Sequence, residues 1–74
     1  MNVTVELSGQ LIPGMPRKQT LRLEQPITVR EVAVLLGLEV DDVGLVVING
    51  LQSEMEDPVP PNCRLSFFPY LAGG

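Results

Sequence analysis

The chain has 74 residues, a net charge of −4, one cysteine and no histidine. This length allows one small domain, the 45% of apolar residues can fill its core, and the acidic balance argues against nucleic acid as a partner, because that affinity depends on clustered cations. The same composition excludes a Cys/His zinc site, a Cys-ligated iron–sulfur cluster, an internal disulfide and a histidine-dependent catalytic triad, and no apolar run approaches the roughly 20 residues that cross a membrane.

Two alternating segments begin the chain and predict a β-hairpin. Apolar and polar residues alternate along residues 2–8 and again along 18–24, which is the period of a strand with one buried face. Residues 9–16 between them contain two glycines and two prolines, so they predict a loop. The side chains expected to point inward are Val3, Val5, Leu7, Leu21 and Leu23.

Residues 28–36 carry the clearest local signal in the sequence and predict a short helix. Thr28, followed three positions later by Glu31, forms a capping box, in which each side chain accepts a hydrogen bond from the backbone amide of the other residue. Ile27 and Val32 occupy the two positions of a hydrophobic staple around this cap, and a glycine follows the last residue, where helices commonly end. We expect the helix to bury an apolar stripe made of Val32, Leu35 and Leu36.

The middle of the chain predicts a connector, a strand and a tight turn. Residues 38–44 would connect the helix to the sheet through a turn at an Asp-Asp pair. Residues 45–48 are apolar at every position, which predicts a central strand buried on both faces. Asn49-Gly50 is a strong signal for a tight turn, so residues 51–55 could form a short return strand.

The last strand is predicted over residues 64–68, and the order of elements then defines a fold class. Three prolines within 57–62 predict a rigid loop before this strand, and Pro69 should end its pairing because proline has no amide hydrogen. The order predicts an α+β fold of the β-grasp type, with a mixed sheet of four to five strands and one helix on one face. The first and last strands would be the parallel central pair, and residues 1–74 would form one domain with a flexible tail at 69–74.

Few side chains are candidates for chemistry of their own. Cys63 stands at the head of the last strand with no histidine to activate it, so we expect a small, partly buried residue rather than a nucleophile or a persulfide carrier. Carboxylates gather at Glu54, Glu56 and Asp57 and at the pair 41–42, but so small a domain offers little room for the pocket that a general acid needs. We interpret them as an acidic rim that helps the domain dock on a partner with a basic patch.

The ending Leu71-Ala72-Gly73-Gly74 suits chemistry that another protein performs on this chain. An extended stretch from residue 69 to 74 reaches about 20 Å past the sheet, which is far enough to thread into a partner's pocket. The two glycines have no β-carbon, so the backbone can pass through a slot too narrow for side chains. The terminal carboxylate is ionised at neutral pH and can attack an activated phosphate to become an acyl-adenylate. The plain alternative is a frayed end without function.

Four features together resemble the MoaD/ThiS-type ubiquitin-like sulfur carriers. They are the β-grasp order, the Thr-Val-Arg-Glu-Val helix start at 28–32, the Val-Val-Ile-Asn-Gly strand and turn at 46–50, and the ending Phe-Phe-Pro-Tyr-Leu-Ala-Gly-Gly at 67–74. The resemblance covers essentially the whole chain, and the ending is most similar to that of the small subunit of molybdopterin synthase. Relatives often have an Asp-Gly turn where this chain has Pro61-Asn62-Cys63, and many carry proline or a small residue in place of Tyr70.

The resemblance implies a carrier protein rather than an enzyme. An E1-like enzyme would use ATP to adenylate the carboxylate of Gly74, and sulfur from the persulfide of a sulfur donor protein would replace AMP to give a Gly74 thiocarboxylate. The tail would then enter a sulfur-acceptor enzyme, such as the large subunit of molybdopterin synthase or a thiazole synthase, with Phe68, Pro69 and Tyr70 at the partner interface. No bound cofactor, no metal, no nucleic-acid or membrane partner and a cytoplasmic location are expected.

Other functions stay open on the sequence alone. The sulfur could serve thiamine biosynthesis or another pathway, and the activated Gly74 could instead be joined to lysines of other proteins, as in ubiquitin-like tagging. A β-grasp docking module without any tail chemistry is a third possibility. A β-grasp ferredoxin is excluded because its cluster needs four cysteines.

Overall fold

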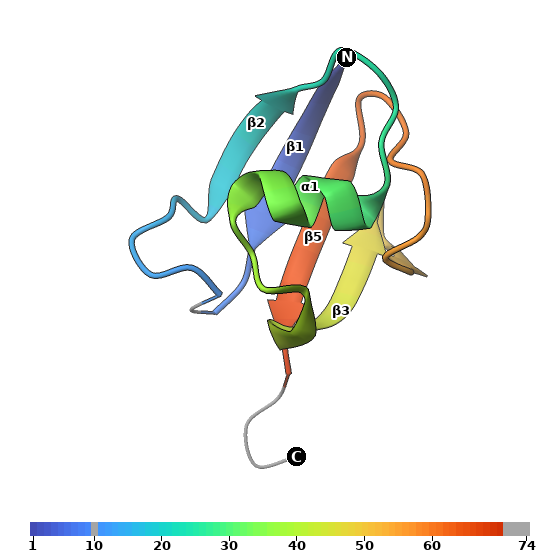
Figure 1. Ribbon diagram of the computed structural model, residues 1–74. Helices are drawn as coiled ribbons and strands as arrows, with labels where there is room; N and C mark the ends of the chain where they lie inside the picture. Colours follow the sequence, from blue (N-terminus) through green and yellow to red (C-terminus); the bar gives the residue numbers. More distant parts are fainter. Residues whose placement is uncertain (10, 71–74) are drawn as a thin grey trace.

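The sheet has five strands, and the last strand of the chain lies at its centre. A computed structural model of the protein describes residues 1–9 and 11–70. The strand order is β2-β1-β5-β3-β4, and α1 crosses one face of the sheet (Figure 1). This is the predicted α+β fold of the β-grasp type, and its elements are β1 Asn2–Leu7, β2 Lys18–Arg22, α1 Val29–Leu36, the 3₁₀ helix η1 Val40–Asp42, β3 Val43–Ile48, β4 Leu51–Ser53 and β5 Arg64–Pro69.

Strand β5 forms ladders with a neighbour on each side. It runs parallel to β1 and antiparallel to β3, so the predicted parallel pairing of the first and last strands is confirmed. Phe67 lies opposite Leu7 of β1 and opposite Val46 of β3. Both Phe67 and Leu65 are 0% exposed, because the helix covers the face of β5 on which they lie. Truncating a buried phenylalanine of this kind typically costs about 3–5 kcal/mol of stability.

The core lies entirely between α1 and one face of the sheet. The helix buries Val29, Val32, Ala33 and Leu36, which follow the i, i+3, i+4, i+7 spacing of one helical face. The predicted stripe was therefore wrong in one member, because Leu35 lies outside this spacing and is 66% exposed, as is Val34.

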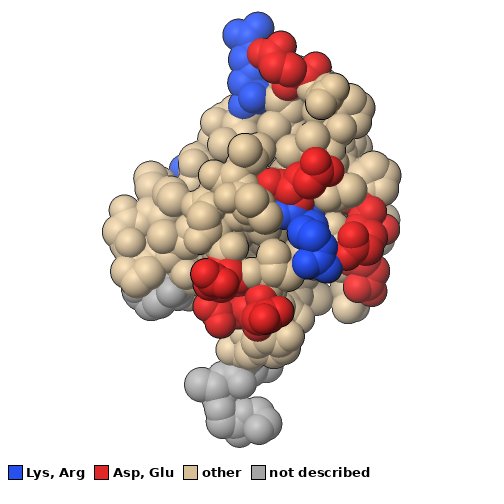
Figure 2. All heavy atoms as spheres, in the orientation of Figure 1, with Lys and Arg blue, Asp and Glu red and all other residues tan. Residues whose placement is uncertain are grey.

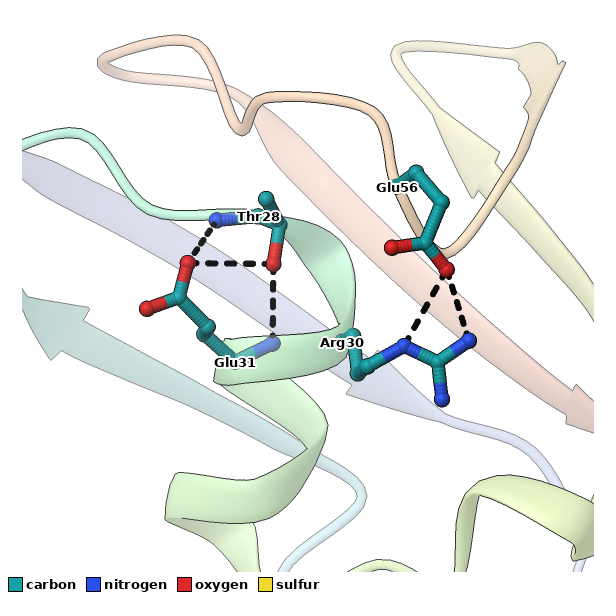
Figure 3. Close-up of polar contacts among 4 residues, drawn as sticks. All are labelled: Thr28, Arg30, Glu31 and Glu56. Carbon is teal, nitrogen blue, oxygen red and sulfur yellow. Dashed lines mark hydrogen bonds and ion pairs between the residues drawn. The ribbon is translucent and has the colours of Figure 1, made fainter.

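The capping box predicted at the start of α1 is present in both halves (Figure 3). The Glu31 amide donates to Thr28 Oγ1 at 3.2 Å, and the Thr28 amide donates to Glu31 Oε1 at 3.0 Å. Gly37 ends the helix in the left-handed conformation, with φ of 82°. Ile27 packs against the core cluster that contains Val32, as a hydrophobic staple requires.

The loop after β4 completes the helix start by supplying acceptors for the next two amides. The Val29 amide donates to the Asp57 carbonyl at 3.0 Å, and the Arg30 amide donates to the Met55 carbonyl at 2.9 Å. An ion pair between Arg30 Nη2 and Glu56 Oε1 at 2.6 Å joins the same two segments (Figure 3). Because both side chains of this pair are largely exposed, its net contribution to stability is small, and the backbone bonds fix the loop on the helix.

Strand β3 corrects the prediction that residues 45–48 are buried on both faces. Leu45 is 37% exposed and Val47 is half-buried, and both point away from α1. Within residues 1–9 and 11–70 the domain has one layer of helix, so a strand residue that points to the other face is not covered by a helix. Uniform apolar character therefore marked a strand with one covered face and one open apolar face, rather than a doubly covered strand.

Two turns use residues with positive φ in the places the sequence suggested. Asn49 and Gly50 between β3 and β4 have φ of 50° and 85°, as a type I′ hairpin turn requires. Asn62, before β5, has φ of 58°, so asparagine takes the left-handed position at this departure from the Asp-Gly pattern. Strand β5 also runs one residue further than predicted, to Pro69, which pairs with Val43; proline lacks the donor but keeps its carbonyl acceptor.

Thr28→Ala should destabilise the domain by about 0.5–2 kcal/mol, because the Glu31 amide loses its acceptor at the start of α1. Urea unfolding followed by circular dichroism would show this as a lower midpoint with an unchanged slope. Thr28→Ser is the matched control, since it keeps an oxygen at the cap, and it should retain most of the wild-type stability. Equal losses in both variants would contradict a capping role for the hydroxyl.

Candidate functional site

The candidate site is the point where the chain leaves the sheet, at the end of β5. Phe68 lies on the face opposite α1, directly across from Leu45, and is half-buried. Tyr70, the first residue after the strand, is 67% exposed. Figure 1 shows that β5 ends beside the start of β3 and the short helix η1. Among the site residues predicted from the sequence, Phe68, Pro69 and Tyr70 come together here, and Leu71, Ala72, Gly73 and Gly74 lie outside the described residues.

An apolar surface on the open side of the sheet adjoins this point. Leu45 and Val47 of β3 lie on the same face as Phe68 of β5, since opposite residues of neighbouring strands share a face. A shallow open hollow here is lined by Gly44, Leu45, Phe68, Pro69 and Tyr70. We call Leu45, Val47, Phe68 and Tyr70 the open-face cluster.

The sequence reasoning placed Phe68 at a partner interface but missed its neighbour Leu45. Because the run 45–48 predicts burial on both faces, the sequence offers none of its residues as a surface residue. One signal could have found Leu45: the predicted fold has a single helix, so every second residue of each inner strand must face away from it. An apolar residue at one of these alternate positions therefore lies on the exposed face of the sheet.

A second hollow lies on the other side of the same segment. It is lined by Leu11 of the β1–β2 loop, Asp42 of η1, Pro69 and Tyr70. Tyr70 therefore stands between two hollows, with the open-face cluster on one side and the β1–β2 loop with η1 on the other. Both hollows are open to solvent, so these residues form an exposed surface around the end of β5 and not an enclosed cavity.

The carboxylates are concentrated in one stretch of the sequence. Seven of the nine acidic residues, and only one of the five cations, fall within residues 30–57. Figure 2 shows them as red groups over the helix-bearing side, including a group over η1 near the end of β5. Asp57 accepts a hydrogen bond from the Glu54 amide at 2.9 Å, and Glu56 pairs with Arg30, so these two side chains hold their loop in place.

The described part of the chain holds neither a cluster of metal-binding side chains nor a membrane-spanning helix. Within residues 1–9 and 11–70, no group of three or more His, Cys, Asp or Glu side chains is placed to hold a metal ion. The same residues contain no helix that is both long and apolar enough to span a bilayer.

Cys63 is part of the core. Its residue is 2% exposed, and burial raises the pKa of its thiol, so the reactive thiolate form is disfavoured. Its backbone carbonyl accepts from the Thr4 amide at 3.0 Å, which ties the start of β5 to β1. Its environment is more enclosed than expected from sequence, and it favours a structural role.

The arrangement of strands and helix is that of a ubiquitin-like β-grasp domain. No protein-family model and no curated protein matches the sequence. Among solved structures, the chain is similar to one in the complex of subunits 1 and 2 of molybdopterin-converting factor from Helicobacter pylori 26695. The TM-score is 0.64 at 17% identity, and the match covers 100% of both chains. The family resemblance found in the sequence is thus confirmed at the level of the fold.

The Cys63 thiol should react with a disulfide reagent such as DTNB more than about tenfold more slowly in the native protein than in urea, because reaction requires an opening of the core. Absorbance of the released thiolate measures both rates. Cys63→Ser would give no signal and serves as the blank. A native rate equal to the unfolded rate would contradict burial of the thiol and reopen a reactive role for it.

Proposed function

We propose that this protein is a sulfur carrier whose C-terminal Gly74 is adenylated and converted to a thiocarboxylate, and that it serves molybdopterin biosynthesis. The observation that carries the proposal is the position at which β5 ends. The central strand β5 brings Tyr70 to the edge of an exposed apolar surface, and four further residues ending in Gly-Gly follow it. The full-length structural likeness to a chain of molybdopterin-converting factor supports the same pathway.

The proposed chemistry takes place on the chain end and is catalysed by partners. A carboxylate oxygen of Gly74 attacks the α-phosphorus of ATP bound by an E1-like enzyme, which forms the acyl-adenylate and releases pyrophosphate. The terminal sulfur of a persulfide then attacks the acyl carbon, and AMP leaves. A second thiol cleaves the resulting sulfur–sulfur bond by disulfide exchange, which leaves the thiocarboxylate on Gly74.

The carrier contributes access and recognition to these steps. Glycine at 73 and 74 leaves the acyl carbon unhindered, so a partner can close around the backbone. No residue of the described domain is needed as acid, base or metal ligand in this scheme. Catalysis and ATP binding belong to the partner, in the cytoplasm where ATP is available.

We propose that the open-face cluster is the surface on which partners dock. Apolar side chains that are exposed next to a reactive segment can hold the domain while the tail is engaged, and such anchors carry much of the binding energy of an interface. The protein of similar fold occurs in a complex with a second subunit, which supports a large-subunit partner here. The acidic side chains around η1 would steer a partner with a basic rim toward the chain end.

Incubation with the activating enzyme, ATP and a persulfide donor should convert the protein to a species heavier by one sulfur-for-oxygen exchange, as intact-mass spectrometry would show. Deleting Gly74 should abolish the conversion without changing the urea midpoint, because the buried core that the structure describes, in residues 1–9 and 11–70, ends at Phe67. High-mass conjugates in place of the exchange would favour the protein-modifier alternative. Full biological activity after deletion of Gly73 and Gly74 would favour the docking module.

Leu45→Ser should weaken binding to the large partner subunit by more than about tenfold, or about 1.4 kcal/mol, because it removes an apolar anchor from the open-face cluster. Calorimetric titration measures the affinity. Leu35→Ser is the matched control, since it makes the same change at an exposed leucine on the opposite, helix-bearing face, and it should bind as the wild type does. Equal weakening in both variants would contradict the assignment of the open face.

A further inference from the structure

The end of β5 passes unusually close to two glycines, through main-chain atoms at Gly44 and through the Pro69 ring at Gly9. A β-carbon added at Gly44 of β3 would lie 2.9 Å from both the Cα and the nitrogen of Tyr70, and 3.0 Å from the Pro69 carbonyl oxygen. A β-carbon added at Gly9 of the β1–β2 loop would lie 2.9 Å from Pro69 Cγ. Separations below 3.0 Å are essentially never seen for real β-carbons, so a side chain at either position would displace its neighbour.

Gly44 is not required by its own backbone conformation. Gly14, Gly37 and Gly50 all have φ above +80°, and open space surrounds the position of an added β-carbon at each of them. Gly44 is the reverse case: its φ lies outside the positive range that disfavours side chains, but the space beside it is filled by backbone. The contact at Gly44 is with main-chain atoms of residues 69 and 70, which no rotamer change can move aside.

The strand pairing is irregular at the same place. Val43 pairs with Pro69 and Leu45 pairs with Phe68, so Gly44 is an extra residue with no partner on β5. Such a bulge bends its strand locally and commonly redirects the chain next to it. Here the bulge presents a residue without a side chain to the segment that leaves the sheet.

We propose that Gly44 and Gly9 form a narrow passage that holds Pro69 and fixes where Tyr70 lies, and so sets the point from which the chain continues toward Gly74. The two glycines act as positioning residues through Pro69 and Tyr70. This role in the reaction rests on the proposed carrier function, whereas the passage itself does not. Holding Tyr70 in place removes conformational freedom before a partner engages the tail, so less is lost when the tail enters a pocket.

Tyr70 can be observed directly by fluorescence, because the chain has one tyrosine and no tryptophan. Its signals therefore report whether the passage holds it in place. Gly44→Ala should displace Tyr70, which would lower its fluorescence anisotropy and shift its amide signal in a ¹H–¹⁵N spectrum. Gly14→Ala is the control, since it strains a glycine with positive φ in open space and should leave the Tyr70 signals unchanged. Unchanged Tyr70 signals in a folded Gly44→Ala protein would overturn the passage.

A double-mutant cycle tests the Gly9 side of the passage and keeps the inference falsifiable if Gly44→Ala does not fold. Gly9→Ala introduces backbone strain, because φ is +68°, together with the contact to Pro69 Cγ. The strain is present with Pro69 and with Pro69→Ala, but the contact disappears when the ring is removed. Gly9→Ala should therefore lower the urea midpoint more in the wild-type background than in Pro69→Ala, and additive effects would overturn this contact.

A kinetic experiment tests the proposed positioning role by measuring how the E1-like enzyme activates the tail. Gly44→Ala should raise KM for the carrier about 5- to 30-fold, the effect of one further residue to be ordered, with little change in kcat. Thr28→Ala is the control for lost stability, because its cap is remote from the chain end, and its KM should not change. A moved Tyr70 signal with unchanged KM would overturn the positioning role. Absence of any activation in the wild type would refute the carrier function while the spectroscopic result for the passage still stood.

Discussion

The central place of β5 is the constraint on which the rest of the structure depends. A strand that pairs on both sides is held by two ladders, and on β5 these ladders surround Leu65 and Phe67, which the helix seals from water. Because the last strand of the chain is the one in the middle, the residues after it emerge from the most firmly held part of the sheet. A chain end at an edge strand would start from a position that fraying could move.

The single helix layer determines which face of the sheet is buried and which is exposed. The helix start is tied to the loop after β4 by the amides of Val29 and Arg30, so α1 lies fixed over one face only. The opposite face is not covered by a helix, and its apolar residues Leu45, Val47 and Phe68 lie next to the end of β5. The single helix layer thus explains both the buried core on one face of the sheet and the open-face cluster on the other.

Local chemistry made much of the fold predictable from sequence. The capping box, the Asn49-Gly50 turn and the strand alternation are each set by neighbours in the chain, and all were found where expected. The run 45–48 was misjudged because burial depends on which face of the sheet the helix covers, and Leu35 because the helix turns the stripe of Val29, Val32, Ala33 and Leu36 to the core. Spacing along the chain reports neither fact. The role of Gly44 was invisible for a stronger reason: it comes from the approach of Tyr70, which lies 26 positions later in the chain.

The separation between core and chain end explains how such a small domain can carry a reactive group. Among the described residues, every buried apolar side chain precedes Phe68, so the core is built before the strand reaches the residues that carry the proposed chemistry. Small domains have little stability in reserve, and a reactive group inside the core would place each chemical step in conflict with folding. Placing the chemistry beyond β5 removes that conflict, and among the described residues the end of β5 is held against the domain where Pro69 and Tyr70 contact Gly9 and Gly44.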